Sequence, residues 1–415
     1  MSIQKIVVIG AGHGGFQVAA SLRQNGYQGA LQLVGDEPGL PYQRPPLSKA
    51  YMLGKISEIA MLFRPAEFYQ TEKIELIQDS VLSINREAKT VDLNSGKVLS
   101  YDHLIIASGA RNRLLTLPGA DLEGVHGIKT REDADVLAPL LGSIKKVAVI
   151  GAGFIGLEFA AVAAAQGAEV HVIELGERPM QRAISAPMSD VFRLAHEGWG
   201  VKFHFGTGIS ALESDGNSDS VARLLTTDGE AIEVDRVVYG IGVIPNAEIA
   251  SEAGLAVDNG IVVDEMLLTS DPNISSLGDV ASFPCVWFHG QHIRLESVQN
   301  AVDQARTIAA RLTDNSAAYK ALPWFWTDQG DLKLQIAGLS IGCNETVVVG
   351  SVDDRKLSVL CFRDGELICV ESCNRPGDHM VARKLLARVS GLTPDIAKAQ
   401  DFDLKAWELA NRPSA

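Results

Sequence analysis

The chain has 415 residues, of which 46% are hydrophobic and 21% charged, with a formal net charge of −14. A chain of this length usually folds around more than one hydrophobic core, so we expect two or three soluble, globular domains. The negative charge disfavours nucleic acid as a partner, and no apolar run is long enough to cross a bilayer, so we expect no nucleic-acid or membrane role.

The N-terminus and the cysteines favour a cytoplasmic location. Residues 1–4 lead directly into an apolar run, which leaves no room for a signal or transit peptide. An odd number of cysteines without a secretory context is typical of reduced thiols, and their spacing is not that of a metal site. All five lie in the last third of the chain: Cys285, Cys343, Cys361, Cys369 and Cys373.

A glycine-rich turn follows the first predicted strand, Lys5–Ile9. Residues 10–15 read G-A-G-H-G-G and open a helix predicted to run to about Asn25. In G-x-G-x-x-G the first glycine permits a tight turn and the second lets a pyrophosphate approach the backbone. The third lets the helix pack closely on the strand. The next predicted strand, Ala30–Val34, ends at two acids, Asp36 and Glu37, either of which could bind an adenosine ribose.

The passage that follows contains loops, a hairpin and a further strand. Residues 38–49 are rich in proline, and residues 81–99 alternate polar and apolar side chains around an N-S-G turn. Residues 104–109 (L-I-I-A-S-G) are expected to form a buried strand that is broken by small residues.

A second glycine-rich turn lies about 140 residues after the first. Residues 151–156 read G-A-G-F-I-G after the apolar run Lys146–Ile150, and a helix is predicted from Leu157 to about Gln166. Two such turns predict two bound dinucleotides, most simply for electron transfer between them. The following strand ends at Glu174, whose charge would repel the 2′-phosphate of NADPH and so favours NADH. Two arginines a few residues later, Arg178 and Arg182, leave NADPH open.

The remainder of the chain is richer in alternating strands, such as Lys356–Phe362 and Glu366–Glu371, before a helical stretch from about Asp378. We therefore predict an α/β protein with two Rossmann-like dinucleotide-binding domains and a C-terminal α+β domain. The predicted boundaries are 1–113 with 245–320, 114–244, and 321–415.

The ordered set of motifs resembles the flavoprotein ferredoxin reductases that serve bacterial haem-thiolate monooxygenases and aromatic-ring dioxygenases, which are related in fold to glutathione reductase. The segments that carry this resemblance are 10–15, P-P-L-S-K at 45–49, A-S-G at 107–109, 151–156 with Glu158, 240–246, 269–279, 296–298 and P-W-F-W at 323–326.

The resemblance implies FAD in the first dinucleotide domain, NADH in the second, and a C-terminal domain beside the flavin. The implied acceptor is an acidic 2Fe–2S ferredoxin, and the implied assembly is a monomer or weak homodimer. Disulfide reductases of the same fold use two cysteines beside the flavin. Here the first cysteine is Cys285, so the electrons must leave by another route.

Three residues have implied catalytic roles. The resemblance puts Lys49 near flavin N5, Glu158 facing the same region, and Trp326 over the opposite flavin face, next to the ferredoxin. A cation beside N5 would stabilise the anionic reduced flavin. Judged without the resemblance, Lys49 could be a solvated loop lysine, Glu158 a carboxylate favoured by the helix dipole, and Trp326 part of a half-buried strand.

The remaining implied residues contact the cofactors. Asp279 is placed at the ribityl chain, Val298 at the pyrimidine edge of the flavin, and Val81 at the adenine, whereas His13 is expected only as a helix-start side chain near the phosphates. The residues implied for FAD are Gly10, Gly12, His13, Gly14, Gly15, Asp36, Glu37, Arg44, Lys49, Val81, Ala107, Ser108, Gly109, Lys129, Asp279 and Val298. Those implied for NADH are Gly151, Gly153, Phe154, Ile155, Gly156, Glu158, Glu174 and Gly242. A basic docking patch could draw on Arg44, Arg64, Arg306 and Lys333.

Two other functions stay open. An NADH oxidase or peroxidase-like flavoenzyme would pass electrons to oxygen or peroxide, but it would usually need a redox cysteine, which is missing from the first 284 positions. A redox-sensing binding protein, similar to apoptosis-inducing factor, would turn over slowly with every carrier.

Overall fold

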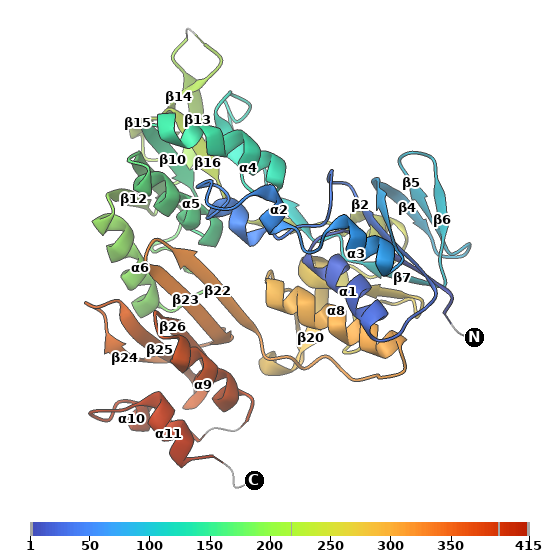
Figure 1. Ribbon diagram of the computed structural model, residues 1–415. Helices are drawn as coiled ribbons and strands as arrows, with labels where there is room; N and C mark the ends of the chain where they lie inside the picture. The colour runs from blue at the N-terminus through green and yellow to red at the C-terminus, as the bar shows by residue number, and fades with distance from the viewer. Residues whose placement is uncertain (1–2, 217, 389–390, 413–415) are drawn as a thin grey trace. The chain divides into compact units, whose positions relative to one another are not determined.

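The computed structural model describes residues 3–216, 218–388 and 391–412. The chain forms two compact units (Figure 1). The first contains residues 1–44, 58–111 and 243–323, and the second contains residues 45–57, 112–242 and 324–415. The three-domain division stays a prediction, because the second unit includes both the second predicted dinucleotide region and the C-terminal region.

The first unit is built on a five-stranded parallel sheet in the order β19-β7-β1-β2-β3. Its central strands are buried on both faces, as their continuous apolar runs predict. Helices α1 (His13–Gln24) and α8 (Val298–Leu312) lie side by side on it (Figure 1). The strands are β1 (Lys5–Ile9), β2 (Ala30–Gly35), β3 (Ile74–Gln78), β7 (His103–Ile106) and β19 (Ile274–Ser276).

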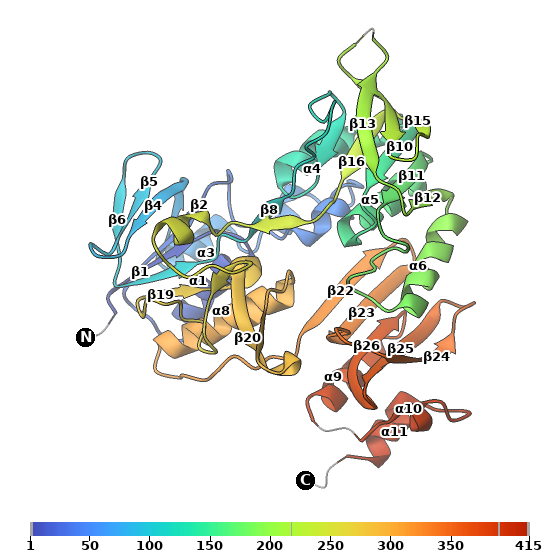
Figure 2. The same ribbon diagram turned by 180° about the vertical axis from the view of Figure 1, so that it is seen from behind.

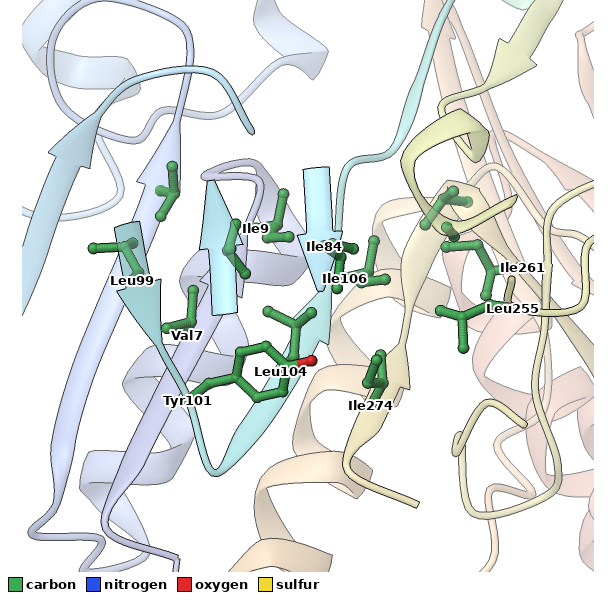
Figure 3. Close-up of a cluster of buried hydrophobic side chains, with 14 of the residues drawn as sticks. Val7, Ile9, Ile84, Leu99, Tyr101, Leu104, Ile106, Leu255, Ile261 and Ile274 are labelled. Carbon is green, nitrogen blue, oxygen red and sulfur yellow. The ribbon is translucent and has the colours of Figure 1, made fainter. Parts of the chain in front are cut away.

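The other face of this sheet carries the core shown in Figure 3. Val7 and Ile9 from β1 meet Leu104 and Ile106 from β7, and Ile274 from β19 lies beside them. Strand β7 ends at Ile106, so the prediction of a strand through residue 109 was too long. Residues 107–109 instead continue the chain without regular structure, and Gly109 adopts a φ of 66°, which is incompatible with a strand.

Smaller elements complete the first unit. An antiparallel sheet of β4 (Val81–Asn85), β5 (Thr90–Leu93) and β6 (Val98–Ser100) forms where the alternating pattern predicted a hairpin. The remaining elements are α2 (Glu58–Met61), α3 (Ala66–Thr71), α7 (Glu248–Glu252), β8 (Ala110–Asn112), β17 (Val243–Pro245), β18 (Ile261–Val262), β20 (Ala281–Cys285) and β21 (Gln291–Ile293).

The second unit repeats the parallel architecture in the order β12-β11-β10-β16-β9. Helix α5 (Phe154–Ala165) is buried on nearly every side and begins three residues before the predicted start. The strands are β9 (Val125–Gly127), β10 (Lys146–Ile150), β11 (Glu169–Glu174), β12 (Val201–Phe205) and β16 (Arg236–Tyr239). Around them lie α4 (Arg131–Leu137), α6 (Ala186–Gly198), β13 (Ile209–Ser214), β14 (Val221–Thr226) and β15 (Ala231–Glu233).

The second unit also contains an antiparallel sheet in the order β22-β23-β26-β25-β24 (Figure 2). Its strands are β22 (Trp324–Gln329), β23 (Leu332–Gly338), β24 (Glu345–Ser351), β25 (Lys356–Arg363) and β26 (Glu366–Cys373). Helices α9 (Pro376–Leu386), α10 (Pro394–Ala397) and α11 (Leu404–Ala410) follow. The parallel and antiparallel sheets confirm the predicted fold class. Within the described part of the chain, none of the helices combines the length and apolar character needed to cross a bilayer.

A buried carboxylate ties the antiparallel sheet to the start of α6. Glu371 on β26 is fully buried, and its two oxygens bond the backbone N–H of Ser185 at 2.7 Å and the Ser185 hydroxyl at 2.5 Å. Burial raises the pKa of Glu371 from 4.5 to about 7. The two hydrogen bonds from Ser185 and, more weakly, the Arg178 guanidinium act in the opposite direction, and the Cys343 thiol adds to the rise in pKa.

The raised pKa predicts a stability that falls as the pH increases. Between about pH 4.5 and pH 7 the folded protein keeps a proton that the unfolded chain has released, so stability is highest below this window and declines through it. Glu371→Gln can keep both partners without a charge, because its amide oxygen can accept the Ser185 N–H and its amide nitrogen can donate to the Ser185 hydroxyl oxygen. We expect its unfolding free energy to exceed that of the wild type by about 3 kcal/mol near pH 8 and by less than about 1 kcal/mol near pH 5.

Chemical denaturation at the two pH values measures this difference. The matched control is Glu366→Gln, because Glu366 is exposed on the same strand. A gain from Glu371→Gln that is equal at both pH values would contradict the titration of Glu371.

Candidate functional site

The first glycine cradle, residues 10–15, has the close backbone contacts that require glycine. Gly10 adopts a φ of 100°, and a Cβ there would lie 2.2 Å from the carbonyl oxygen of Ala107. A Cβ on Gly15 would lie 1.7 Å from the carbonyl oxygen of Gly10. At Gly12, by contrast, a Cβ would meet no described atom within 4 Å. The cradle is therefore closed on the protein side and open where a diphosphate would approach.

The second predicted FAD signature lies against this cradle. A Cβ on Gly14 would come within 2.3 Å of the Leu277 side chain, which directly precedes Gly278 and Asp279. Gly278 has a φ of 75°, and its N–H donates to the buried Gln304 side chain at 2.7 Å. The turn that carries Asp279 is thus fixed beside the cradle.

The two acids after β2 have different surroundings. Asp36 is exposed, whereas Glu37 is partly buried and accepts hydrogen bonds from the Tyr42 hydroxyl and the Arg44 guanidinium. The structure therefore gives Arg44 a partner within the first unit, in an ion pair with Glu37.

Residues 107–109 are fixed by Asn246. Its side-chain amide donates to the Ser108 carbonyl at 2.9 Å, and the Ser108 hydroxyl donates to the Asn246 carbonyl at 2.8 Å. The backbone N–H of Asn246 also donates to the Gly109 carbonyl at 2.9 Å. Three hydrogen bonds therefore hold residues 107–109 beside Gly10, and their predicted contact with FAD stays a prediction.

Four further predicted residues lie at the ends of elements. Val298 is the first residue of α8, after the N-cap Ser297, and Val81 is the first residue of β4. His13 begins α1, and its ring packs edge-on against Phe63 with ring centroids 4.9 Å apart. In the second unit, Lys129 precedes the N-cap of α4. Their predicted contacts with FAD stay predictions.

The second cradle, residues 151–156, reproduces the geometry of the first. A Cβ on Gly151 would lie 2.6 Å from the Gly240 carbonyl oxygen, and one on Gly156 would lie 2.3 Å from the Gly151 carbonyl oxygen. The nearest described atom to a Cβ on Gly153 is 3.9 Å away. The cradle is again closed behind and open in front.

Glu174 lies at this second cradle. Its carboxylate accepts the Ala152 N–H at 2.7 Å and the Gly176 N–H at 2.8 Å, so the strand end is tied directly to the glycine turn. The Arg178 guanidinium is already used elsewhere. It donates to the backbone carbonyls of Gln181, Ile184 and Ser185.

The other predicted residues of the second unit surround the same turn. Phe154 packs on Phe325 of β22 with ring centroids 4.5 Å apart, whereas the side chain of its neighbour Ile155 is 38% exposed. Gly242 has a φ of 98° in the turn after β16, and its carbonyl accepts the Arg113 N–H at 3.0 Å.

The structure brings Lys49 and Glu158 together. The Lys49 ammonium lies 2.7 Å from the Glu158 carboxylate, and these side chains are 21% and 5% exposed. Lys49 follows the 3-10 turn η1 (Pro45–Ser48) and also donates to the Pro45 carbonyl at 3.1 Å. The pair therefore joins this turn to the first turns of α5.

Two hydroxyl groups also donate hydrogen bonds to the Glu158 carboxylate. Ser48 donates to one carboxylate oxygen at 2.5 Å, and Thr327 of β22 donates to the other at 2.6 Å. Thr327 was missed by sequence reasoning, which considered only the tryptophans of this strand. Its separation of 169 positions from Glu158 explains why no local pattern indicates the contact.

Trp326 lies on the opposite side of β22 from Thr327, because side chains alternate along a strand. It is partly buried, and its ring is 5.5 Å from that of Trp324. Arg383 of α9 lies over the Trp324 ring at 5.2 Å. Of the predicted basic residues, Lys333 is exposed in the second unit, and Arg306 is exposed in the first, where it pairs with Asp303.

The arrangement fits dinucleotides in two places. Each cradle is open only over its second glycine and begins a helix of 12 residues, whose N-terminal N–H groups favour a diphosphate. The five cysteines are free thiols, and the first of them is Cys285 of β20. A flavin bound in the first unit would have no thiol within residues 3–216 to reduce.

Comparisons with known proteins give the family. Residues 4–305 match the pyridine nucleotide-disulphide oxidoreductases, and residues 324–407 match the reductase C-terminal domain. The chain is 50% identical to rhodocoxin reductase of Rhodococcus erythropolis, over 96% of this chain and 93% of that one.

Two solved structures are similar over almost their whole length. One is the ferredoxin reductase for the CYP199A2 system from Rhodopseudomonas palustris, with a TM-score of 0.95 at 48% identity, covering 99% of this chain and 100% of that one. The other is a covalent putidaredoxin reductase–putidaredoxin complex, with a TM-score of 0.95 at 34% identity, covering 99% of each chain.

The chain belongs to the pyridine nucleotide-disulphide oxidoreductase family and, within it, to the ferredoxin reductases. It is therefore a flavin oxidoreductase that uses FAD and NAD(P)H.

The open position of each cradle predicts separable effects of alanine. Gly12→Ala and Gly153→Ala should fold, because both positions have ordinary φ angles and free space for a methyl group. We expect Gly12→Ala to lose FAD and Gly153→Ala to keep FAD but to bind NADH at least about tenfold more weakly.

Flavin content of the purified protein and NADH titration measure the two effects. Gly15→Ala serves as the contrast, because its methyl group would collide with backbone and should reduce folding itself. Full FAD occupancy in Gly12→Ala would show that the first cradle does not hold the flavin diphosphate.

Proposed function

We propose that the protein transfers electrons from NADH through FAD to a 2Fe–2S ferredoxin that supplies a haem-thiolate monooxygenase or a ring-hydroxylating dioxygenase. The observation that carries this proposal is the pair of glycine cradles, one in each unit, with open space over Gly12 and Gly153. The similarity to rhodocoxin reductase and to the putidaredoxin reductase complex supports a ferredoxin as the acceptor.

FAD, when bound, accepts a hydride from a nicotinamide and returns its electrons one at a time. The residues of this chain bind the two cofactors and orient them. In this proposal the first cradle holds the FAD diphosphate, Asp36 or Glu37 binds its adenosine ribose, and Asp279 binds its ribityl chain. The second cradle holds the NADH diphosphate, and Glu174 binds the ribose beside it.

In this proposal Lys49 places a positive charge beside flavin N5, the atom that receives the hydride. Its ammonium is held by the Glu158 carboxylate and by the Pro45 carbonyl, so it is oriented before any cofactor approaches. A cation fixed in advance stabilises developing negative charge without rearranging at the moment of reaction. Glu158, bonded by three donors, is proposed to keep Lys49 in place rather than to accept a proton from the substrate.

NADH is proposed over NADPH because of Glu174 and Arg178. The Glu174 carboxylate is fixed by two backbone N–H groups at the end of β11, where a 2′-phosphate would meet its charge. Arg178, which on sequence alone could have bound that phosphate, is engaged by three carbonyls.

This specificity predicts the effect of neutralising Glu174. Wild-type kcat/KM should be at least about tenfold higher with NADH than with NADPH, and Glu174→Gln should reduce that ratio to about one, because the charge repulsion is lost. Stopped-flow flavin reduction with each nucleotide measures it. Glu177→Gln, a neutralisation at an exposed position in the same loop, should leave the ratio unchanged. Equal wild-type rates with the two nucleotides would contradict the role of Glu174.

The exit of electrons is proposed to pass Trp326, with exposed cations such as Lys333 and Arg306 helping to dock an acidic ferredoxin. The protein is proposed to act in the cytoplasm as a monomer or weak homodimer. The five free thiols agree with a reducing compartment.

The decisive experiment follows NADH-driven reduction of cytochrome c with a 2Fe–2S ferredoxin, with a rubredoxin, and with no carrier. We expect rapid reduction only with the ferredoxin, and a rate that falls steeply between about 50 mM and 500 mM salt because docking is electrostatic. Rapid oxygen consumption without any carrier would replace the proposal with an oxidase. Slow turnover with every carrier, together with a long-lived flavin–nicotinamide complex, would favour a redox-sensing binding protein.

A further inference from the structure

The Lys49–Glu158 pair is the outer end of a longer chain of buried polar groups in the second unit. Thr327, which donates to Glu158, accepts a hydrogen bond from the Gln329 amide at 3.2 Å. The Gln329 carbonyl oxygen lies 2.9 Å from Nε2 of His196 on α6. Thr327, Gln329 and His196 are fully buried.

The hydrogen bonds that link His196, Gln329 and Thr327 point toward the carboxylate, and the Gln329 amide also donates to the Met180 sulfur at 3.9 Å. Burial lowers the pKa of His196 to about 4, so its ring is neutral and carries one N–H. With that proton on Nε2, the ring donates to the Gln329 carbonyl. The Gln329 amide then donates to Thr327, whose own proton is left for Glu158.

The far end of the chain is closed by aromatic rings. His196 lies 4.8 Å from the Trp199 ring and 6.0 Å from the Phe203 ring, and its Nδ1 has no partner among the described residues. The donors that link His196 to Glu158 therefore point in one direction and end at the Glu158 carboxylate. A buried network of this kind restricts the position of the group at its end, because each member is held by its hydrogen-bond partner.

We propose that Thr327 and Gln329, supported by His196, are positioning residues that keep the Glu158 carboxylate directed at Lys49. They contact no reacting atom. Through Glu158 they fix the place of the Lys49 ammonium, and so the rate at which the bound flavin is reduced. This inference rests on the proposed function, in which Lys49 lies beside the flavin.

A purely structural role is the alternative that the experiment must separate. The same hydrogen bonds join β22 to α5 and α6, so their removal could simply destabilise the second unit. A structural role alone would lower the melting temperature without moving the flavin midpoint potential.

The test replaces the donor while keeping its shape. Thr327→Val removes the hydroxyl, and Thr327→Ser keeps it. For Thr327→Val we expect the limiting rate of anaerobic flavin reduction by NADH to fall about tenfold, with the NADH KM changed less than about twofold. The midpoint potential of the bound flavin should become more negative.

Two control variants separate the loss of the hydroxyl donor from a general effect of changing a buried threonine. Thr327→Ser should retain more than about half of the wild-type rate, because its hydroxyl can still donate. Thr226→Val removes another buried threonine of the second unit, which bonds Asp228 and is outside the network, and it should leave the rate and the potential unchanged. If Thr327→Val does not fold with full FAD occupancy, Gln329→Met is measured instead, with an expected loss of about threefold in the same direction.

The inference is overturned if Thr327→Val, or Gln329→Met in its place, has the wild-type rate and flavin midpoint potential. It is also overturned if Thr327→Ser loses as much as Thr327→Val. Failure of the proposed function would give a different result. A wild-type protein that reduces no ferredoxin would show that its electron acceptor is another molecule. Flavin reduction by NADH would still test the hydrogen-bond network in that case.

Discussion

The buried carboxylate of Glu158 is the constraint that organises the second unit around its chemistry. A charge that is only 5% exposed is costly unless it is fully bonded, and here the bonds come from η1, from β22 and from the Lys49 ammonium. These segments are far apart in sequence. The hydrogen bonds to this one carboxylate therefore hold the proline-rich turn and the C-terminal sheet against α5, and the same contacts orient Lys49.

The two glycine cradles impose a second constraint, which is steric rather than electrostatic. Gly15 and Gly156 each face a carbonyl oxygen of their own turn at a distance that leaves no room for a methyl group, so helix and strand pack at backbone contact. In each cradle the second glycine, Gly12 or Gly153, faces open space. The same solution appears twice because the same ligand group, a diphosphate, has to reach the start of a helix.

Much of this could be predicted from sequence because it is local. A buried strand, a glycine turn and a helix follow one another within about 20 residues in both units, and the P-P-L-S-K segment identified Lys49. The contacts of Thr327 with Glu158 and of Gln329 with His196 could not be predicted, because they join strand and helix positions 169 and 133 residues apart that carry ordinary polar side chains. Arg178 shows the same limit: its three carbonyl partners belong to a loop whose path no pattern indicates.

The placement of the cysteines has a practical consequence. The thiolate is the species that reacts with alkylating reagents. Burial raises the pKa of Cys285 and raises that of Cys373 to about 12, and a hydrogen bond with Cys361, together with burial, raises that of Cys343. The native thiols should therefore be slow to take up a maleimide or iodoacetamide dye. A cysteine introduced at an exposed position, such as Glu366, would then accept a single fluorophore without first removing the others.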